Sequence, residues 1–512
     1  MKNFPMLQVL NPAIRLLANR RIRAWDKNLE PENMKRVQEQ ALLKHCQTAA
    51  QTAFGKEHGL GKIKSYADFK KAMPLRAYAG FEPYIQRMRR GERDVLWPGL
   101  INYYGQSSGT SSTAAKHKFL PISQSQIKWQ QKAAFDVMAR YLDITGDKSL
   151  LGGYSLGLFP PSILKEEVPG VYTGSNPGIM FRKVPALAAR TTIPRLPIRD
   201  IEDHDKKLEA IAKNYINYDV RAISGTTCWF SIFFDKLLKE TKAKTVSEVW
   251  PNLRVLFGGG VNADPYRDLI KDRVGKDIIL MDNYNATEGG LFSVTDSLED
   301  RGMRMIPDRG VFYEFVKRED HGREDAERFA LWEVEPDVDY SIAFTTPSGL
   351  FAYYVNDFVR FSSVYPHRME FVGRPSGVLS ITQELTTYIE IEKAVSKAQA
   401  EVPCSITEYC VGPDVGVDAS SKGRYLFFFE FTEKPSNVEE FLSVIDSELA
   451  MQNRVYREHR DNDVAILPPV LKILKSGSAP QIMQELGFKS VQNKFPRILD
   501  DKKRDLVSQF VS

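Results

Sequence analysis

The sequence predicts an α/β protein, because short apolar runs alternate with helical stretches along its middle third. Apolar runs at 220–225, 253–257 and 278–281 are each followed by a polar or glycine-rich turn. Amphipathic stretches at 230–241 and 264–273 lie between them, and such alternation is typical of an α/β core. Ligands of these cores gather where strands run into loops, so the turns are candidate binding positions.

The next segment predicts a β-rich part of the same large domain. Residues 328–363 are rich in β-branched and aromatic residues and contain a turn signal at Pro347-Ser348-Gly349. That composition favours antiparallel strands. The large N-terminal domain is therefore expected to hold mixed β-sheets flanked by helices, together with this β-rich part.

A small C-terminal α+β domain is expected after residues 373–381. A helical segment begins there, followed by a strand at 424–431 and a helix at 437–460. The unit has about 130 residues, near the typical size of a domain. Small residues at 376–377 are suited to a hinge, so the predicted domains are 1–375 and 376–512.

The first hundred residues predict helices. A periodic stretch at 34–53 leads into Phe54-Gly55, a plausible helix end, and residues 65–90 predict short helices broken by Pro74, Gly80 and Pro83. The run LINYYGQSSGT, from Leu100, predicts a strand that enters a glycine-containing loop.

Bulk composition excludes several classes of protein. The 512 residues carry 70 basic and 65 acidic side chains, a net charge of +5 with no basic block, so no nucleic-acid partner is expected. No run approaches the ~18 apolar residues that span a bilayer, so no stable membrane insertion is expected. The apolar N-terminus is interrupted by Asn11, Pro12 and Arg15 and is expected to pack on the body of the protein. The four cysteines lack metal-ligand spacing, which favours free thiols and a cytoplasmic location.

Three constellations carry the candidate chemistry. The first is the loop 104–113, YGQSSGTSST, with Lys116 and Lys118 behind it. Hydroxyls, exposed N–H groups and a lysine suit phosphate oxygens, although the loop is not a Walker A motif. A solvated turn is the alternative explanation for such a loop.

The second constellation is Tyr284 to Gly290, YNATEGG, which follows an apolar run. An aromatic ring can stack on adenine, the Thr287 hydroxyl can reach a phosphate, and the Glu288 carboxylate can hold Mg²⁺ that bridges phosphates. The alternative is purely structural, with Thr287 capping a helix and Glu288 in its first turn.

The third constellation is the run 353–361, YYVNDFVRF. Aspartate is unfavourable in an aromatic strand unless it has a partner. Asp357 can accept hydrogen bonds from a ribose diol, and Arg360 can offset phosphate charge. A structural Asp357–Arg360 ion pair is the alternative.

The order and spacing of these constellations resemble one family, the acyl-acid-amido synthetases of the plant Gretchen Hagen family and its bacterial relatives, within the adenylate-forming enzymes. The resemblance covers nearly the whole chain. Its phrases are the stretch from TAFGKEHGLGKIKSYADF to RGERDVLWPG, then SSGTSSTAAKHKFLPIS, ISGTTCW, WPNLRVLFGGG, YNATEGG, EVEPDVDYSIAFTTPSGLFAYYVNDFVRF, LAMQNRVYREHR and VQNKFPR.

The resemblance implies a role for each matching residue. Phosphate binding falls to the loop residues Ser107, Ser108, Gly109 and Thr110, with Lys118 favoured over Lys116. The turn Gly258–Gly260, including Gly259 and Gly260, passes beside the base that Tyr284 flanks. Thr287 and Glu288 complete the second motif, with Glu288 as the Mg²⁺ ligand. Asp357 binds ribose and Arg360 is a nearby candidate. The residues expected to take part in catalysis are Lys494, Glu288 and Thr110.

The sequence departs from the family pattern at three places. The first loop is about two residues long, so Lys116 and Lys118 compete for the lysine position. Asn356 stands where a glycine usually precedes the aspartate, and Thr287 stands where many members have serine. The first two differences put the local loop geometry in question and remove no functional group.

The expected activity needs ATP and Mg²⁺. The resemblance implies that a carboxylic acid is activated as an acyl-adenylate and passed to the amine of an amino acid, while a mobile C-terminal domain presents Lys494. The acid pocket is expected between the β-rich part and the loops near 225–229 and 258–262. Two alternatives stay open: a ligase with a thiol acceptor such as coenzyme A, and a non-catalytic nucleotide- or acyl-binding protein.

Overall fold

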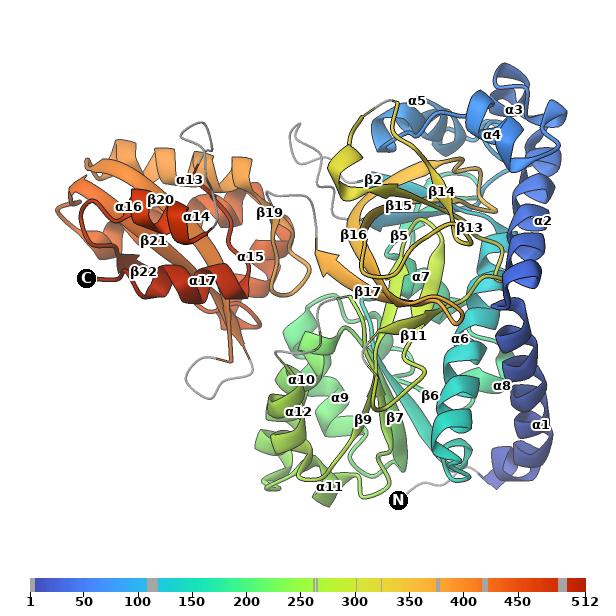
Figure 1. The fold of residues 1–512 in the computed structure, drawn as a ribbon. Helices are drawn as coiled ribbons and strands as arrows, with labels where there is room; N and C mark the ends of the chain where they lie inside the picture. Colours follow the sequence, from blue (N-terminus) through green and yellow to red (C-terminus); the bar gives the residue numbers. More distant parts are fainter. Residues whose placement is uncertain are drawn as a thin grey trace.

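The computed structural model describes residues 5–107, 118–260, 263, 266–300, 302–323, 325–373, 378–416, 422–486 and 495–512, with the backbone alone at 5–10, 107 and 356. These residues form a large body and a smaller C-terminal lobe, shown at the left of Figure 1. The predicted fold class, a mixed α/β protein with a large N-terminal and a small C-terminal domain, is confirmed. The boundary between domains 1–375 and 376–512, with its hinge at Ser376–Gly377, falls outside the described residues and stays a prediction, as does the mobility of the small domain.

The body begins with helices that lie along one side of it, and further helices cover its sheets (Figure 1). The helices of the described body are α1 (Pro5–Asn28), α2 (Pro31–Ala49), α3 (Ala53–Glu57), α4 (Tyr66–Ala72), α5 (Tyr78–Arg89), α6 (Gln124–Thr145), α7 (Asn176–Arg182), α8 (Ala186–Ala189), α9 (His204–Asn214), α10 (Thr227–Thr241), α11 (Val246–Val249) and α12 (Arg267–Val274). Those of the lobe are α13 (Tyr388–Glu401), α14 (Val438–Gln452), α15 (Arg454–Arg460), α16 (Ala479–Glu485) and α17 (Asp501–Ser508).

The strands run in the same chain order. Those of the body are β1 (Tyr103–Ser107), β2 (Lys118–Ile122), β3 (Tyr154–Leu158), β4 (Lys165–Val168), β5 (Val171–Gly174), β6 (Thr192–Ile193), β7 (Val220–Gly225), β8 (Val255–Phe257), β9 (Ile279–Met281), β10 (Asn283–Ala286), β11 (Gly290–Val294), β12 (Met303–Met305), β13 (Phe312–Lys317), β14 (Phe329–Ala330), β15 (Asp339–Thr345), β16 (Tyr353–Ser363) and β17 (Arg368–Gly373). They are followed by β18 (Val378–Leu379), β19 (Thr386–Thr387), β20 (Ser405–Val415), β21 (Gly423–Glu433) and β22 (Val470–Ile473).

The body is built on three sheets in the part of the chain that the structure describes. The parallel sheet has the order β6-β3-β7-β8-β9, the long antiparallel sheet has the order β10-β11-β12-β17-β16-β15-β13-β14, and the small mixed sheet has the order β2-β1-β5-β4. The lobe contains the hairpin β18-β19 and the C-terminal sheet β20-β21-β22. The three predicted strands of the α/β core are confirmed as β7, β8 and β9, and the turn at 347–349 joins β15 to β16 as expected.

Several expected helix boundaries are wrong. The helix predicted at 34–53 is α2 and ends at Ala49, and Phe54 and Gly55 lie inside α3, where an added Cβ on Gly55 would collide with the backbone of Ala49. This glycine therefore serves close packing and does not end a helix. Pro74 separates α4 from α5, but α5 continues through Gly80 and Pro83.

In the lobe, the stretch 437–460 forms two helices and not one. Asn453 ends α14 and accepts a hydrogen bond from the Tyr456 N–H, which caps α15. The long strand β20, which pairs with β21, was not predicted from the sequence.

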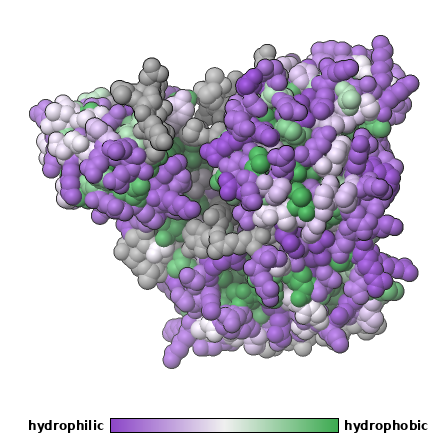
Figure 2. All heavy atoms as spheres, in the orientation of Figure 1, coloured by the Kyte–Doolittle hydropathy of each residue, from purple (hydrophilic) through white to green (hydrophobic). Residues whose placement is uncertain are grey.

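The surface of the described residues is mostly hydrophilic in the view of Figure 2, with apolar residues scattered between polar ones. No helix of the described ranges combines the length and apolar character that crossing a bilayer requires. Cys46, Cys228 and Cys410 are buried free thiols and Cys404 is half-buried, as the sequence suggests.

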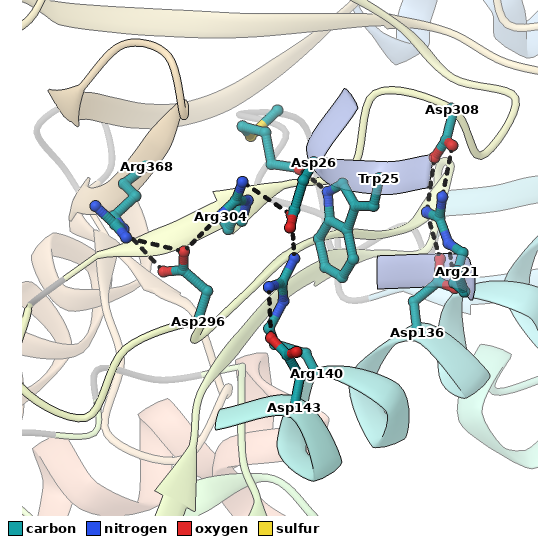
Figure 3. A network of polar contacts seen from close by, with 11 residues as sticks. Arg21, Trp25, Asp26, Asp136, Arg140, Asp143, Asp296, Arg304, Asp308 and Arg368 are labelled. Carbon is teal, nitrogen blue, oxygen red and sulfur yellow. Dashed lines mark hydrogen bonds and ion pairs between the residues drawn. The ribbon is translucent and has the colours of Figure 1, made fainter. Parts of the chain in front are cut away.

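The N-terminal helix packs on α6, as expected, and is held there by buried ion pairs. The carboxylate of Asp136, on α6, is fully buried between Arg21 of α1 at 2.7 Å and Arg309 at 2.6 Å. Arg21 also lies 2.6 Å from Asp308, and although burial alone would raise the pKa of Asp308, the guanidinium outweighs it and lowers that pKa. Figure 3 shows the arginine joining both aspartates.

A second series of ion pairs lies beside those of Asp136. Asp26 of α1 contacts Arg140 of α6 at 2.9 Å and Arg304 of β12 at 3.0 Å, and Arg304 continues to Asp296 at 3.0 Å (Figure 3). Between the two series, the Trp25 indole N–H donates to the Met305 carbonyl at 2.7 Å. These contacts tie α1 and α6 to β12 of the long antiparallel sheet and to the loops on either side of it.

Removing the shared carboxylate is expected to destabilise the whole body. Asp136→Ala removes the carboxylate partner of the partly buried Arg309 and leaves Arg21 with Asp308 alone, and should lower the free energy of unfolding by about 3–5 kcal/mol. Urea unfolding followed by circular dichroism measures this.

The matched control is Asp325→Ala, which removes a carboxylate from the exposed pair with Arg323 and should change stability little. Equal effects of the two substitutions would show that burial of the Asp136 pairs is unimportant.

Candidate active site

A cavity of about 1720 Å³ lies where the sheets of the body meet the lobe. Its walls come from the carboxyl ends of β7 and β8, the β10–β11 hairpin, β16 and, on the side of the lobe, residues 382–385 and 454–464. Loops that are far apart in the sequence therefore face one space, as strand-end placement predicts.

The first constellation reaches this cavity through β1 and β2. Gln106 and Lys118 line it, and Lys118 pairs in register with Ser107 at the end of β1. The Lys118 ammonium also lies 5.9 Å from the centre of the Tyr78 ring. Ser108, Gly109, Thr110 and Lys116 lie outside the described residues, so the choice between Lys116 and Lys118 stays a prediction.

Gly105 of β1 brings the first constellation against the second. A Cβ on this residue would lie 2.5 Å from Cγ2 of Thr287. Only glycine allows the strand to approach so closely. The glycine-containing strand end and the Thr287 turn thus form one continuous wall.

The second constellation is a β-hairpin turn. Residues 287–289 connect β10 to β11, so the alternative in which Thr287 caps a helix is wrong. The local reason is the short antiparallel pairing of Ala286 with Gly290, which has a φ of +98°. Thr287 and Glu288 both line the cavity.

Glu288 is oriented by a tyrosine from the third constellation. The buried Tyr353 hydroxyl lies beside the Glu288 carboxylate, and burial followed by this negative charge raises the pKa of Tyr353 well above its usual value. A hydroxyl in this position is suited to hold the carboxylate at the cavity wall. Tyr353 stands in the quoted motif, but the sequence alone gave it no role.

Tyr284 and Asp357 also meet. The Tyr284 hydroxyl donates to Oδ2 of Asp357 at 2.7 Å, and both residues are largely buried. The centre of the Tyr284 ring lies 5.6 Å from that of Phe292 and 6.3 Å from that of Phe371. The structure therefore places Tyr284 as the residue that orients Asp357, while Asp357 itself lines the cavity.

Arg360 does not join this group. Its guanidinium lies on the exposed side of β16, 2.7 Å from Asp339 of β15, and it is absent from the described cavity lining. This position corrects both sequence-based interpretations of Arg360. It neither faces the cavity as a phosphate contact would nor pairs with Asp357. The strand pleat explains it, because Arg360 pairs across the ladder with Asp339.

The glycine turn after β8 is held by hydrogen bonds to two side chains. The Gly259 N–H donates to Oγ1 of Thr227 at 3.1 Å, and the Asn283 side chain donates to the Gly258 carbonyl. Gly260 has a φ of +82°, which favours glycine. Gly259 and Gly260 both line the cavity, as the motif suggests.

The lobe contributes residues that sequence reasoning missed. Gln383, with a φ of +76°, extends beside Gly260 and reaches Oγ1 of Thr226 at 3.4 Å. Glu384 holds this loop by accepting from the backbone N–H groups of Ile381 and Thr382, each at 2.7 Å. Neither residue carries a sequence signal. The positive φ of Gln383, its contact with Thr226 and the backbone hydrogen bonds to Glu384 are visible only in the folded structure.

A histidine pair borders the same junction. His204 and His459 both lie against Trp229, with ring centres 3.9 and 5.1 Å from the indole centre. Burial lowers the pKa of His204 to about 4 and, together with the nearby His204, that of His459 to about 3. Both rings are therefore neutral at pH 7, and within the lobe a hydrogen bond joins Nδ1 of His459 to the Thr382 hydroxyl at 2.7 Å.

Three models of one family match the chain in order. The GH3 family N-terminal domain matches residues 28–156, the GH3 family central domain residues 304–374 and the GH3 family C-terminal domain residues 389–503, together more than half of the chain. The three models define a member of a family of acyl-acid-amido synthetases, and its fold is shared by solved adenylate-forming ligases. The chain belongs to the GH3 family, which confirms the resemblance seen in the motifs.

The relatives are distant but match over almost their whole length. Jasmonoyl–L-amino acid synthetase GH3.5 of Oryza sativa subsp. japonica is 23% identical, over 91% of this chain and 92% of its own. Indole-3-acetic acid-amido synthetase GH3.15 of Arabidopsis thaliana is 24% identical over 94% of both.

The fold likeness extends to solved structures. AtGH3.15 acyl acid amido synthetase in complex with 2,4-DB matches with a TM-score of 0.61 at 20% identity, covering 96% of this chain and 95% of that one. A 2-hydroxyisobutyryl-CoA ligase in complex with 2-HIB-AMP and CoA matches with a TM-score of 0.53 at 13% identity, over 92% and 91%. At these identities the likeness concerns the fold alone.

The different placements of Asp357 and Arg360 predict different effects on nucleotide binding. Asp357→Asn keeps the shape but removes the charged acceptor that faces the cavity, and should weaken ATP binding roughly tenfold to a hundredfold, the range for a hydrogen bond to a charged group. Isothermal titration calorimetry with a non-hydrolysable ATP analogue measures this.

Arg360→Ala, on the same strand but facing solvent, is the control and should bind the analogue like the unsubstituted protein. A larger loss for Arg360→Ala than for Asp357→Asn would contradict the assignment.

Proposed function

We propose that this protein is an ATP-dependent acyl-acid-amido synthetase that makes an acyl-adenylate from a carboxylic acid and passes the acyl group to an amino acid. The observation that carries the proposal is the meeting of two tyrosine–carboxylate pairs, Tyr284–Asp357 and Tyr353–Glu288, at one cavity. Membership of the GH3 family supports the proposal, as do the two plant relatives, a jasmonoyl–L-amino acid synthetase and an indole-3-acetic acid-amido synthetase.

The nucleotide is proposed to lie across the strand ends. Asp357, whose carboxylate is fixed by Tyr284, accepts from the ribose diol, and the base lies beside the Gly259–Gly260 turn. Phosphates face Lys118 and Thr287, with the loop residues Ser107, Ser108, Gly109 and Thr110 proposed to add donors. Charged and hydroxyl donors of this kind are the usual partners of phosphate oxygens.

Glu288 fits a magnesium ion. Mg²⁺ is commonly bound by one or two carboxylates together with substrate phosphates, and Glu288 is a single carboxylate on the cavity wall. No cluster of three or more potential metal ligands occurs among the described residues, so the phosphates would supply the remaining oxygens. Bound there, the ion would neutralise phosphate charge.

The reaction needs no protein nucleophile. A carboxylate oxygen of the acid attacks the α-phosphorus, the bond to the bridging oxygen breaks, and pyrophosphate leaves. The neutral amine then attacks the acyl carbon, the bond to AMP breaks, and the amine proton passes to solvent. The residues around the cavity act by positioning the acid and nucleotide and by offsetting charge. Lys494, outside the described residues, is proposed to contact the reacting phosphate.

One assay tests the proposal against both alternatives. ATP–pyrophosphate exchange is expected with at least one acid from a panel of aryl, indolyl and fatty acids, and amide is expected only when amino acids are added. Thioester formation with coenzyme A and no amide would identify a thiol ligase. Exchange with no acid, despite ATP binding, would identify a binding protein.

The Glu288–Tyr353 pair gives a graded prediction. Glu288→Gln removes the negative charge and should reduce exchange at least a hundredfold, since preorganised charge is among the largest catalytic terms. Tyr353→Phe only loosens the carboxylate and should reduce exchange roughly tenfold, with partial recovery at high Mg²⁺. No dependence on Mg²⁺ in either variant would remove Glu288 from metal binding.

Lys494→Ala is expected to depress exchange while leaving the affinity for ATP nearly unchanged, because its contact is proposed to form only with the reacting phosphate. Lys502→Ala, on the exposed face of α17, is the control. Unchanged turnover of Lys494→Ala would exclude the lysine from the mechanism.

A further inference from the structure

An apolar extension of the cavity runs away from the nucleotide residues, between α6, the parallel sheet and the segment α7–α8. We call it the acyl slot. Its floor is one face of β3 and β7, on which Ser155 pairs in register with Ala222 and Gly157 with Ser224. The small side chains of Ser155 and Ala222 leave space above the sheet, whereas the rings of Phe159 and Phe181 cover Gly157.

The roof of the acyl slot is one stripe of α6. Gln130, Ala134 and Met138 follow each other at intervals of four residues, and all three line the cavity. Residues four apart lie on the same face of a helix. Eight residues of helix span about 12 Å, so the slot is at least this long.

The slot has a defined inner end and a wall of its own. Leu150 and Leu151 line it beyond the start of β3. α8 packs on β6, whose Thr192 pairs with Ser155, so α8 lies at the inner half. On the other side, Phe181 of α7 lies close over Gly157 of β3.

Every cavity-lining residue that α6, β3, α7 and α8 contribute is uncharged, and most are apolar. The slot also opens to the surface through an apolar rim, because Ile163 and Leu187 line it and are each 43% exposed. A lining of this kind favours burial of hydrocarbon. Charged residues of the cavity wall stand outside these four elements, at Lys165, Glu202, Asp203 and Asp205.

Gln130 marks the end of the slot that meets the nucleotide residues. The Gln130 side chain is buried, with the residue 9% exposed, and its Nε2 has no hydrogen-bond partner among the described residues. The side chain packs against Gly290, two residues after Glu288. A buried amide donor without an acceptor is costly, so a ligand oxygen is the natural partner at this point.

We infer that the acid is an elongated aliphatic monocarboxylic acid, with its carboxylate at Gln130 and its chain in the acyl slot. The inference rests on the proposed function and specifies its substrate class. An extended chain advances about 1.2 Å per bond, so about 12 Å accommodates roughly ten bonds. This pocket differs from the expected one, since it lies on α6, α7–α8 and the parallel sheet, away from the β-rich part.

The first test is a chain-length profile of ATP–pyrophosphate exchange. With the even-numbered saturated acids from butyric to myristic acid, KM is expected to fall by about threefold to fourfold per added methylene, then level off near roughly ten carbons. Benzoic and phenylacetic acids should be poorer substrates than decanoic acid. Exchange with the ring acids alone, or a flat profile, overturns the inference and leaves the proposed function standing.

Two neighbouring alanines of α8 locate the slot. Ala188 lines the cavity and Ala189 does not, and both are exposed. Ala188→Phe should raise KM for dodecanoic acid at least tenfold, equal to roughly two lost methylenes, with hexanoic acid unaffected. Ala189→Phe is the matched control and should match the unsubstituted protein with both acids. Identical profiles for the two variants overturn the location.

Gln130→Glu tests the carboxylate end. The new charge should repel the acid and raise KM for every chain length by a similar factor, whereas Gln130→Met should give a smaller rise. A change confined to long chains would contradict the placement of the carboxylate.

Exchange with no acid at all would overturn the proposed function. The slot can then be tested by acid binding alone, measured as the rise in the melting temperature of the protein when decanoic acid is added. A rise that Ala188→Phe removes and Ala189→Phe keeps supports the slot, and no rise in the unsubstituted protein overturns it.

Discussion

The buried carboxylate of Asp136 is the contact on which the arrangement of the body depends. It is shared by Arg21 and Arg309, which come from segments nearly three hundred residues apart in the sequence, and Arg21 continues to Asp308 (Figure 3). Charges buried in this way are costly to separate, so they fix which segments meet. They place α6 against both α1 and the antiparallel sheet.

The position of α6 then determines much of the site. The Gln126 side chain, in the first turn of the helix, donates to the Thr287 carbonyl at 3.3 Å and accepts from the Ser348 hydroxyl. One turn later Gln130 packs beneath Gly290. The ion pairs of Asp136 therefore hold α6 at its middle. The first turns of the same helix support the hairpin that carries Glu288, and the stripe that follows them forms the roof of the acyl slot.

Much of the fold could be predicted from local patterns, and much of the site could not. The strands β7, β8 and β9 and the turn at 347–349 follow from composition and turn chemistry. The turn at Thr287 was ambiguous, because a threonine followed by glutamate suits a helix start as well as a hairpin, and only the pairing of β10 with β11 decides it. Asp357 was recognisable as an aspartate misplaced in an aromatic strand. Arg360 was assigned to the wrong side because Asp339, its partner, lies on a neighbouring strand that sequence proximity does not reveal.

One part of the cavity wall belongs to the body and the other to the lobe, and this division suits the two proposed half-reactions. Asp357, Glu288 and their tyrosines all belong to the long antiparallel sheet and the adjoining hairpin, so their geometry does not depend on the lobe. Gln383 and His459 belong to the lobe, and their described contacts with the body include Thr226, Gly260 and Trp229. Around Trp229 the junction contains two neutral imidazoles, and the Gln383 amide lies beside Gly260. A displacement of the lobe would therefore remake the wall beside Gly260 and leave the Tyr284–Asp357 pair intact, which is the division that two successive reactions on one bound adenylate require.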